Sequence, residues 1–345
     1  AAESSRSDLL RFPRAMLGCW DCLAFSAPPR RANSGAGGSS DKIPEVDPQP
    51  VGSCVQDGQP AATDMPSMSL NLGAGVHLRV AKQERIKDVG TAASHFQQDS
   101  TGITPWWGGL LLATWIAHDA SDAFEGFNII ELGCGSYALP SVAASLRGAA
   151  LMVATDGCNA NVGFARSTLA CNSSALKGCS ARSFAWQDAI ASSELGFWDM
   201  VMFADVIYKH GAAAILAQTI AALLRTGGVV VGTVGLHRMG SSEIFAEMQK
   251  MGFVAQEIPV LNDVLSSASE ASACLNADSR FDAVGSSAWS TNARRNDCKL
   301  VRWTRRGESG QEAPDMSDAL CHQVLHATYV MEDVEPVDAG WVQSE

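Results

Sequence analysis

The sequence predicts an α/β protein in which helices cover both faces of a doubly wound sheet. The first observation is the stretch 127–156, FNIIELGCGSYALPSVAASLRGAALMVATD, which holds an apolar run, a Gly-x-Gly turn, a small-residue helix and a second apolar run. This order is typical of a parallel βαβ unit. The second is that apolar runs of strand length alternate with helical patterns as far as residue 304. Such alternation favours a mostly parallel sheet that is buried on both faces.

The residues before this unit divide into an extension and the start of the folded domain. Residues 1–72 are rich in Pro, Gly, Ser and Ala, and such a composition predicts a disordered extension because it cannot form a packed face. Residues 76–80 (VHLRV) alternate apolar and polar side chains and predict a short, half-exposed strand. The run TPWWGGLLLATWIA at 104–117 then predicts a helix that starts after Pro105.

Three features of the central unit indicate a ligand site, and a fourth supports the helix that follows the turn. Gly133 and Gly135 permit a sharp turn and let a ligand approach bare backbone amides. Pro140 suits the first turn of the following helix, where a missing N–H is harmless. Asp156 ends the second strand, where a carboxylate can accept hydrogen bonds from both hydroxyls of a ribose. Glu131 lies two residues before the first glycine, where it can hold an amino group.

A dinucleotide fold would begin in the same way, so the turn alone does not choose the ligand. The dinucleotide fingerprint prefers a third glycine where this chain has Ala138. An acid at Glu131 suits a cofactor with an amino acid at one end and a nucleoside at the other, which favours S-adenosylmethionine. An ordinary βαβ unit without a ligand remains the alternative.

The rest of the chain extends the alternation and ends in polar segments. Asn159 can cap a helix that runs to Cys171. Further strands are predicted at 181–186, 200–204, 229–234, 253–260 and 299–304, and further helices at 212–224 and from Ser241 or Ser242 to a glycine cap at 252. Residues 265–297, rich in Ser and Ala, predict a disordered insert, and residues 307–345 an acidic, mostly disordered tail.

The candidate ligand residues follow the ends of different predicted strands. Gly133, Asp156, Trp186 and Asp205 each come at or just after the carboxyl end of a strand. The carboxyl ends of parallel strands meet at one edge of a sheet, where ligands of open α/β folds bind. We therefore expect these residues to gather in one site.

Composition narrows the class of partner. The net charge of −12 argues against a general nucleic-acid binder, because phosphate contacts need a basic surface.

The ten cysteines lack the spacing of metal ligands or a disulfide framework; the one close pair, Cys19 and Cys22, has no second pair. We therefore expect no metal and a reducing compartment, the cytoplasm or the nucleus. No apolar run approaches the length of a membrane span.

Four motifs together carry a resemblance to a known family: ELGCGS at 131–136, ATDG at 154–157, FAW at 184–186 and WDMVMFADVIY at 198–208. The chain resembles the seven-stranded class I methyltransferases, and within them the group that methylates lysine, occasionally histidine, side chains of other proteins. Two of these motifs are also similar to the calmodulin-lysine methyltransferase branch: TDG with the nearby Asn159, and VMFAD. The resemblance implies a Rossmann-like, seven-stranded sheet, mostly parallel with an antiparallel last strand, in a domain spanning 73–306.

The resemblance also implies roles for individual residues. It implies that Trp106 closes over the methionine part of the cofactor and that the turn of Gly133, Cys134 and Gly135 lies beneath the amino acid of the cofactor. It also implies that Asp156 holds the ribose, that Trp186 contacts adenine and that Ala204 forms the floor of the pocket. The Asp-x-x-Tyr signature at the mouth corresponds to Asp205 and Tyr208. The chain departs from the family at Ser136 and Tyr137, where many members have Thr-Gly, and the Tyr137 ring must turn away from the cofactor.

The implied chemistry is an in-line methyl transfer that needs no metal. A lysine ammonium, whose free pKa is about 10.4, must first lose its proton. Asp205 is the candidate to orient the amine and accept that proton, and Tyr208 is the candidate to line the lysine channel. The alternatives are a helix cap or a ribose partner for Asp205, and simple packing for Tyr208.

The sequence leaves two other functions open. One is methylation of a small molecule or of a nucleic-acid base, although ADVIY stands where amino-group base methyltransferases have an Asn/Asp-Pro-Pro-aromatic motif. The other is an inactive, methyltransferase-like binding module. The expected partner of an active enzyme is a protein that carries the target lysine, with no nucleic acid and no membrane. The sequence names neither that protein nor the oligomeric state.

Overall fold

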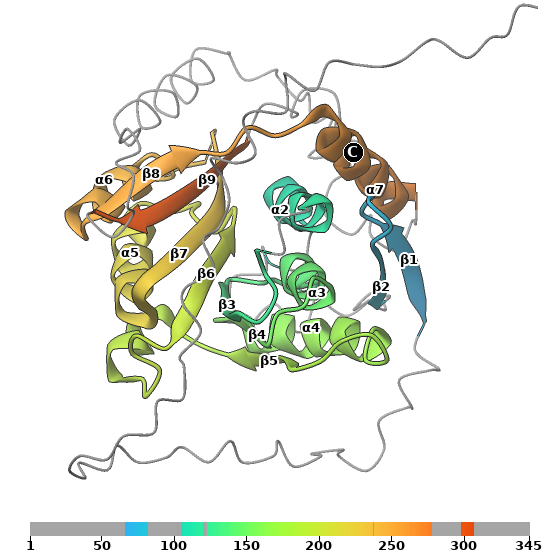
Figure 1. The fold of residues 1–345 in the computed structure, drawn as a ribbon, viewed down its shortest axis with the longest axis horizontal. Coiled ribbons are helices and arrows are strands. Elements are labelled where there is room, and N and C mark those ends of the chain that lie inside the picture. Colours follow the sequence, from blue (N-terminus) through green and yellow to red (C-terminus); the bar gives the residue numbers. More distant parts are fainter. Residues whose placement is uncertain are drawn as a thin grey trace, which may run out of the picture.

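The computed structural model describes residues 66–81, 102, 105–119, 123–236, 238–277 and 298–306. Most of the predicted extension, the later part of the predicted insert and the predicted acidic tail lie outside these residues. The described residues form a seven-stranded sheet and a two-stranded hairpin (Figure 1). The strands of the large sheet are β3 (Asn128–Leu132), β4 (Leu151–Asp156), β5 (Cys179–Ser183), β6 (Trp198–Ala204), β7 (Leu224–Gly235), β8 (Phe253–Glu257) and β9 (Cys298–Arg305).

The order of the strands confirms the predicted fold class. The sheet runs β5-β4-β3-β6-β7-β9-β8. The pairs among β5, β4, β3, β6 and β7 are parallel, whereas β9 is antiparallel to both β7 and β8. The chain proceeds from β3 outward to β5 on one side and then returns to β6 on the other. This reversal beside β3 creates the crevice at the strand ends where doubly wound sheets bind ligands.

Helices cover both faces, and each face has its own core. One face carries α2 (Trp107–His118), α3 (Leu139–Leu146) and α4 (Asn159–Cys171); the other carries the 3-10 helix η4 (Trp186–Ala191), α5 (Ala212–Leu223) and α6 (Glu243–Lys250) (Figure 1). Because neighbouring side chains of a strand point to opposite faces, Ile129 belongs to the first core and Ile130 to the second. Both isoleucines are fully buried. The continuous apolar runs that predicted the strands reflect this two-sided burial.

An additional layer covers the α2 and α4 side. It consists of the hairpin β1 (Ser67–Asn71) and β2 (His77–Ala81) together with α7 (Asn262–Ala277) (Figure 1). The side chain of Asn172 after α4 pairs with the backbone of Arg79: its Oδ1 accepts from the N–H at 2.8 Å and its Nδ2 donates to the carbonyl at 2.6 Å. The folded part therefore starts earlier than the predicted boundary at residue 73, since β1 already begins at Ser67.

Helix α7 corrects the prediction of a disordered insert at 265–297, because residues 262–277 are helical. Val264, Ala268, Ala271 and Leu275 recur three or four residues apart and are all buried. They pack against α2 and β1. The many serines between them dilute the apolar pattern, so the composition of the segment concealed a narrow buried stripe.

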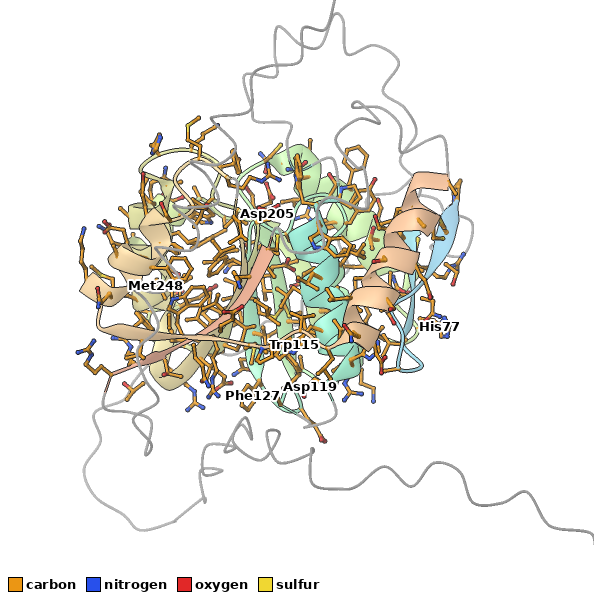
Figure 2. The ribbon with its side chains drawn as sticks, turned by 90° about the horizontal axis from the view of Figure 1, so that it is seen from above. His77, Trp115, Asp119, Phe127, Asp205 and Met248 are labelled. Atoms are coloured by element: carbon orange, nitrogen blue, oxygen red, sulfur yellow. The ribbon has the colours of Figure 1, made fainter. Side chains whose placement is uncertain are left out.

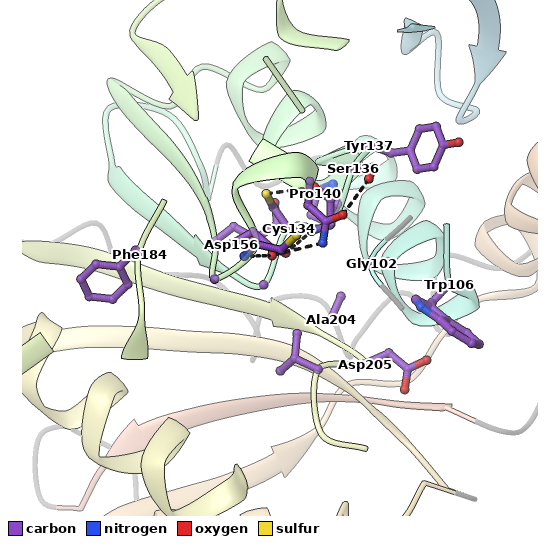
Figure 3. Close-up of a pocket in the computed structure, with 18 of the residues that line it drawn as sticks. Gly102, Trp106, Cys134, Ser136, Tyr137, Pro140, Asp156, Phe184, Ala204 and Asp205 are labelled. Carbon is purple, nitrogen blue, oxygen red and sulfur yellow. Dashed lines mark hydrogen bonds between the residues drawn. The ribbon is translucent and has the colours of Figure 1, made fainter. Parts of the chain in front are cut away.

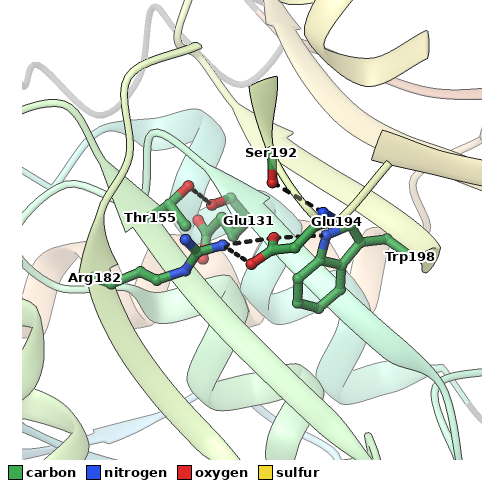
Figure 4. A network of polar contacts seen from close by, with 6 residues as sticks. All are labelled: Glu131, Thr155, Arg182, Ser192, Glu194 and Trp198. Carbon is green, nitrogen blue, oxygen red and sulfur yellow. Dashed lines mark hydrogen bonds and ion pairs between the residues drawn. The ribbon is translucent and has the colours of Figure 1, made fainter. Parts of the chain in front are cut away.

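Strand β5 is displaced from its prediction at 181–186. It ends at Ser183, and Trp186 begins η4. Figure 4 shows what holds this region: Arg182 of β5 donates both to Oε1 and to Oε2 of Glu194 at 2.6 Å, and Glu194 Oε2 also accepts from Trp198 Nε1 at 3.2 Å. Two separate segments are therefore tied to the start of β6. Among the helices that the structure describes, none has the length and apolar character needed to cross a membrane.

Candidate active site

A cavity of about 420 Å³ lies at the carboxyl ends of the central strands. Figure 2 shows Asp205 at the opposite edge of the sheet from Phe127, which precedes β3. All ten residues predicted to act in the site line this cavity: Trp106, Glu131, Gly133, Cys134, Gly135, Asp156, Trp186, Ala204, Asp205 and Tyr208. The structure thus brings together residues from five separate segments, while their individual roles stay predictions.

The Gly-x-Gly turn is held in a left-handed conformation. Gly133 has φ +78 and Gly135 has φ +59. A Cβ at Gly133 would lie 2.6 Å from Val206 Cγ1, and one at Gly135 would lie 2.9 Å from the Gly102 carbonyl oxygen. Both positions therefore need glycine for the backbone angle and for the close approach of other segments.

The amides of this turn are not bare, which corrects one expectation. The N–H groups of Gly133 and Cys134 both donate to the Thr155 carbonyl at 2.8 Å, and the N–H of Gly135 donates to Asp156 Oδ2 at 3.0 Å. The Thr155 hydroxyl in turn donates to the Glu131 carbonyl at 2.6 Å (Figure 4). The turn therefore offers a ligand close approach to the backbone, while these three amides serve to join the ends of β3 and β4.

Asp156 is anchored by three donors (Figure 3). Besides the Gly135 amide, its Oδ1 accepts from the Cys158 amide at 2.8 Å and from Asn161 Nδ2 at 3.2 Å. Its carboxylate is thereby held at the cavity wall with acceptor capacity remaining. Cys158 is the N-cap of α4, so the predicted cap Asn159 is instead the first helical residue.

Asn161 and Gly102 are site residues that sequence reasoning missed. Asn161 is buried and accepts the Ser136 hydroxyl at 3.1 Å, and the Ser136 amide donates to the Gly102 carbonyl at 2.8 Å. The signal for Asn161 was available, since an amide five residues after Asp156 falls in the first turns of α4. Gly102 gave no signal, because only the fold brings it over the Gly-x-Gly turn.

Glu131 is a buried acid at the end of β3. Its Oε2 accepts hydrogen bonds from both the backbone N–H (3.1 Å) and the hydroxyl of Ser141. Burial raises the pKa of Glu131, the bonds from Ser141 act in the opposite direction, and the nearby charge of Asp156 adds to the rise; the resulting pKa is about 7. A positively charged ligand group would relieve the cost of ionising this carboxyl, as expected of a residue that holds an amino group.

Trp186 and Phe184 are aromatic residues of the cavity lining. Trp186 lies near the turn, with its Cζ2 4.0 Å from where a Cβ of Gly133 would lie, and Phe184 is also in the lining. The Trp186 carbonyl accepts the Thr219 hydroxyl at 2.9 Å, which fixes the start of η4 on α5. Figure 3 shows Phe184 at the opposite end of the cavity from Trp106. Phe184 was not singled out from the sequence, although it is the first residue of the FAW motif.

The mouth residue Asp205 adopts φ +54, a left-handed conformation that is uncommon outside glycine. Its side chain is 4% exposed and forms an ion pair with Arg238, with 2.9 Å between Nη2 and Oδ2. The same guanidinium lies over the Trp106 ring, 4.0 Å from its centroid. Arg238 was not predicted from the sequence, although it stands three residues after the end of β7 and so close to the edge of the sheet that holds the site.

The Tyr137 ring turns away from the centre of the cavity, as predicted from its size. It is 4% exposed, and Figure 3 shows its ring pointing away from Asp156 and Ala204. Burial raises the pKa of its hydroxyl, and burial likewise raises the pKa of the Cys134 thiol. Neither group is therefore a candidate nucleophile or base at neutral pH.

Residues 90–251, a little less than half of the chain, match the family model described as lysine methyltransferase. This segment is similar to the lysine methyltransferase family. The match contains the Gly-x-Gly turn, Asp156, Trp186 and Asp205, and it confirms the family resemblance that the sequence motifs indicated. No relative of the chain was found among curated proteins.

Several solved methyltransferase structures are similar to this chain at low sequence identity. The ribosomal protein L11 methylase of Lactobacillus delbrueckii subsp. bulgaricus is 14% identical, with 69% of this chain and 98% of that chain covered and a TM-score of 0.41. A magnesium protoporphyrin IX methyltransferase from Synechocystis PCC 6803, solved with bound SAH, is 14% identical over 58% and 84% of the two chains, with a TM-score of 0.39. An S-adenosyl-L-homocysteine complex of a Geobacter sulfurreducens SAM-dependent methyltransferase is 13% identical over 65% and 100%, with a TM-score of 0.37.

Proposed function

We propose that this protein binds S-adenosylmethionine in the cavity and transfers its methyl group to a lysine side chain of another protein. One observation carries the proposal. Glu131, a buried acid whose pKa is raised to about 7, and Asp156, an acid anchored by three donors, end neighbouring parallel strands and line the same cavity. This pair suits a ligand with an ammonium group and a ribose.

The residues of the cavity fit this cofactor. Glu131 would face the ammonium of the methionine part, and Asp156 would accept hydrogen bonds from the ribose hydroxyls. Glycine at 133 keeps side chains off the turn between the two acids. Phe184 lies at the end of the cavity away from Trp106 (Figure 3), and Trp186 lines the cavity near the turn. When bound, S-adenosylmethionine supplies a methyl carbon activated by a sulfonium.

The acceptor chemistry falls to residues on the Trp106 side of the cavity. The carbon–sulfur bond breaks as the lysine nitrogen forms its bond to the methyl carbon, so the ammonium must first release one proton. Asp205 is the carboxylate that we assign to accept this proton. It does so directly or through a water molecule that passes the proton to solvent. Tyr208 lines the cavity three residues later and presents a ring to the aliphatic part of the lysine. A partly dry mouth favours the neutral amine.

The choice of lysine as acceptor is supported by the family match and by the Asp205-x-x-Tyr208 motif at the mouth. The fold alone would suit other acceptors, because one methyltransferase fold serves many substrates. The experiment must therefore identify the chemical class of the acceptor as well as the cofactor.

Calorimetry tests the cofactor. We expect S-adenosylmethionine and S-adenosylhomocysteine to bind the purified protein, whereas NAD, the ligand of the related dinucleotide folds, should show no binding. Tight NAD binding without binding of either sulfur compound would overturn the proposal.

Transfer of a labelled methyl group tests the acceptor. The protein is incubated with labelled S-adenosylmethionine and a cell extract, and the label is then followed after protease or nuclease treatment. We expect protease to release the label and amino acid analysis to find methyl-lysine. Label that is sensitive to nuclease, or that is confined to small molecules, would reject a protein acceptor.

A further inference from the structure

We propose that Arg238 is a positioning residue that fastens Asp205 and Trp106 together and so shapes the acceptor side of the cavity. The inference rests on the proposed function and deepens it. Asp205 follows β6, Trp106 precedes α2 and Arg238 follows β7, so the three residues come from segments far apart in the chain. Arg238 is in contact with both of the others.

The contacts of Arg238 fix the two partners in different ways. Toward Asp205 it makes a charge-assisted hydrogen bond of 2.9 Å with a carboxylate that is 4% exposed. A hydrogen bond between charged groups in such a protected place is stronger and more directional than one on the open surface. Toward Trp106 it presents the guanidinium 4.0 Å above the ring centroid, which is close for a cation–π contact.

Arg238 is itself held at the cavity edge. Its side chain is 27% exposed, and its backbone carbonyl accepts the Ser241 hydroxyl at 2.7 Å and the Ser241 amide at 3.1 Å. A Cβ at Gly235 would lie 2.8 Å from Arg238 Cγ and 2.7 Å from Asp205 Oδ1, so the glycine makes room for both side chains. The segment after β7 is thus built to bring this guanidinium to Asp205.

We call the contacts of Arg238 with Asp205 and Trp106 the clamp. Its position explains two properties of the mouth of the cavity. Asp205 sits in a left-handed conformation that requires support from its surroundings, and Arg238 supplies a directional part of that support. Trp106 is the residue that the family resemblance places over the methionine part of the cofactor, and the stacked guanidinium restricts its indole. We expect loss of Arg238 to affect methyl transfer more than cofactor binding, because only the former needs Asp205 in a defined orientation.

The test uses the full chain with the substitutions Arg238→Met, Arg238→Lys, Asp205→Asn and the double substitution Arg238→Met/Asp205→Asn. Arg305→Met is the matched control, because Arg305 also stacks on an aromatic ring, 5.1 Å from the Phe253 centroid, but lies outside the cavity lining. Affinity for S-adenosylhomocysteine is measured by calorimetry, and kcat and KM by labelled-methyl transfer to the acceptor found in the extract.

For Arg238→Met we expect affinity for S-adenosylhomocysteine to fall about five-fold, as for loss of one partly exposed cation–π contact, and kcat to fall about 100-fold. Arg238→Lys should recover part of kcat, since the charge remains. If Arg238 acts through Asp205, kcat of the double variant lies within about three-fold of Asp205→Asn alone. Wild-type kcat in Arg238→Met, or independent effects that multiply in the double variant, would refute the role.

Failure of this inference can be told from failure of the proposed function. If the wild-type protein neither binds S-adenosylhomocysteine nor transfers methyl, the proposed function is rejected. The clamp is then tested by denaturant unfolding of the same four variants without ligand. The effects of Arg238→Met and Asp205→Asn on the unfolding equilibrium should be non-additive by about ten-fold, because the two side chains are in contact. Additive effects would reject the clamp by itself.

Discussion

Glu131 accepts two hydrogen bonds from Ser141, one from the backbone N–H and one from the hydroxyl, and both go to the same oxygen, Oε2. The other oxygen, Oε1, takes neither of them. Ser141 lies in the first turn of α3, one residue after Pro140. The start of the helix therefore orients a buried acid that also lines the cavity.

Glu131→Gln is expected to weaken binding of S-adenosylmethionine about 30-fold, since a charge-assisted contact with the ammonium contributes roughly 1.5–3 kcal/mol. Calorimetry measures the change. Glu257→Gln is the matched control. Glu257 lies on β8 outside the cavity lining, and its carboxylate accepts a hydrogen bond from Lys299 at 2.7 Å. Equal affinities for the wild type and Glu131→Gln would show that this carboxylate does not hold the ammonium.

The raised pKa of Glu131 predicts a pH dependence of stability. Between its ordinary value of 4.5 and about 7 the folded protein keeps a proton that the unfolded chain has released. Rising pH therefore removes stability over this window, by roughly 3 kcal/mol at most. The titratable groups that interact with Glu131 are Asp156, Cys134 and Cys179, and Ser141 donates hydrogen bonds to it.

Urea unfolding of the ligand-free protein at pH 5 and pH 7.5 measures this dependence. Glu131→Gln lacks the ionisable group, so the difference between wild type and variant isolates its effect. We expect the stability of the variant relative to the wild type to be higher at pH 7.5 than at pH 5, because most of the window from 4.5 to about 7 lies between these two pH values. A gap between the two proteins that is the same at both pH values would contradict the assignment.

Asp156→Asn is expected to lower affinity for S-adenosylhomocysteine about 100-fold. An amide nitrogen cannot accept from a ribose hydroxyl, and it would face the donors of Gly135 or Cys158 and Asn161. Calorimetry compares the variant with Asp263→Asn, an exposed acid in the first turn of α7. Retention of full affinity would exclude Asp156 as the ribose acid.

Asp205→Asn is expected to keep affinity for S-adenosylhomocysteine within about three-fold and to lower kcat at least 100-fold, because a neutral amide neither orients an ammonium nor accepts its proton. Steady-state kinetics with the labelled donor, together with calorimetry, separate the two effects. Turnover at the wild-type rate would remove Asp205 from the chemistry.

Gly135→Ala is expected to destabilise the fold by about 1–3 kcal/mol, because the added Cβ would lie 2.9 Å from the Gly102 carbonyl oxygen at a residue with φ +59. Gly163→Ala is the control: it is an exposed helical glycine with open space around it, where alanine should add about 0.5–1 kcal/mol of stability. Chemical denaturation measures both. The expectation for Gly135 fails if the two variants unfold at the same denaturant concentration.

Much of the site was predictable because it is built at strand ends. The two acids and two glycines of residues 127–156 follow from one local pattern, and parallel strands bring Asp205 and Trp186 to the same edge. The boundary of β5 and the helix α7 were missed for opposite reasons. In β5 the apolar residues Phe184 to Trp186 continue past the last sheet pairing at Ser183. In α7 a buried stripe is diluted by serines.

The sequence by itself determined the α/β class, the Gly-x-Gly turn and the two acids at its flanks, because these depend on the periodicity of apolar residues and on backbone angles within a few residues. Only the tertiary structure decided that Arg238 binds Asp205 across 33 positions of the chain, that Gly102 closes on Gly135, and that the amides of the turn are already in use. Apolar periodicity reports which face of an element is buried. It carries no information on which polar side chains meet, since that depends on how the loops return over the sheet.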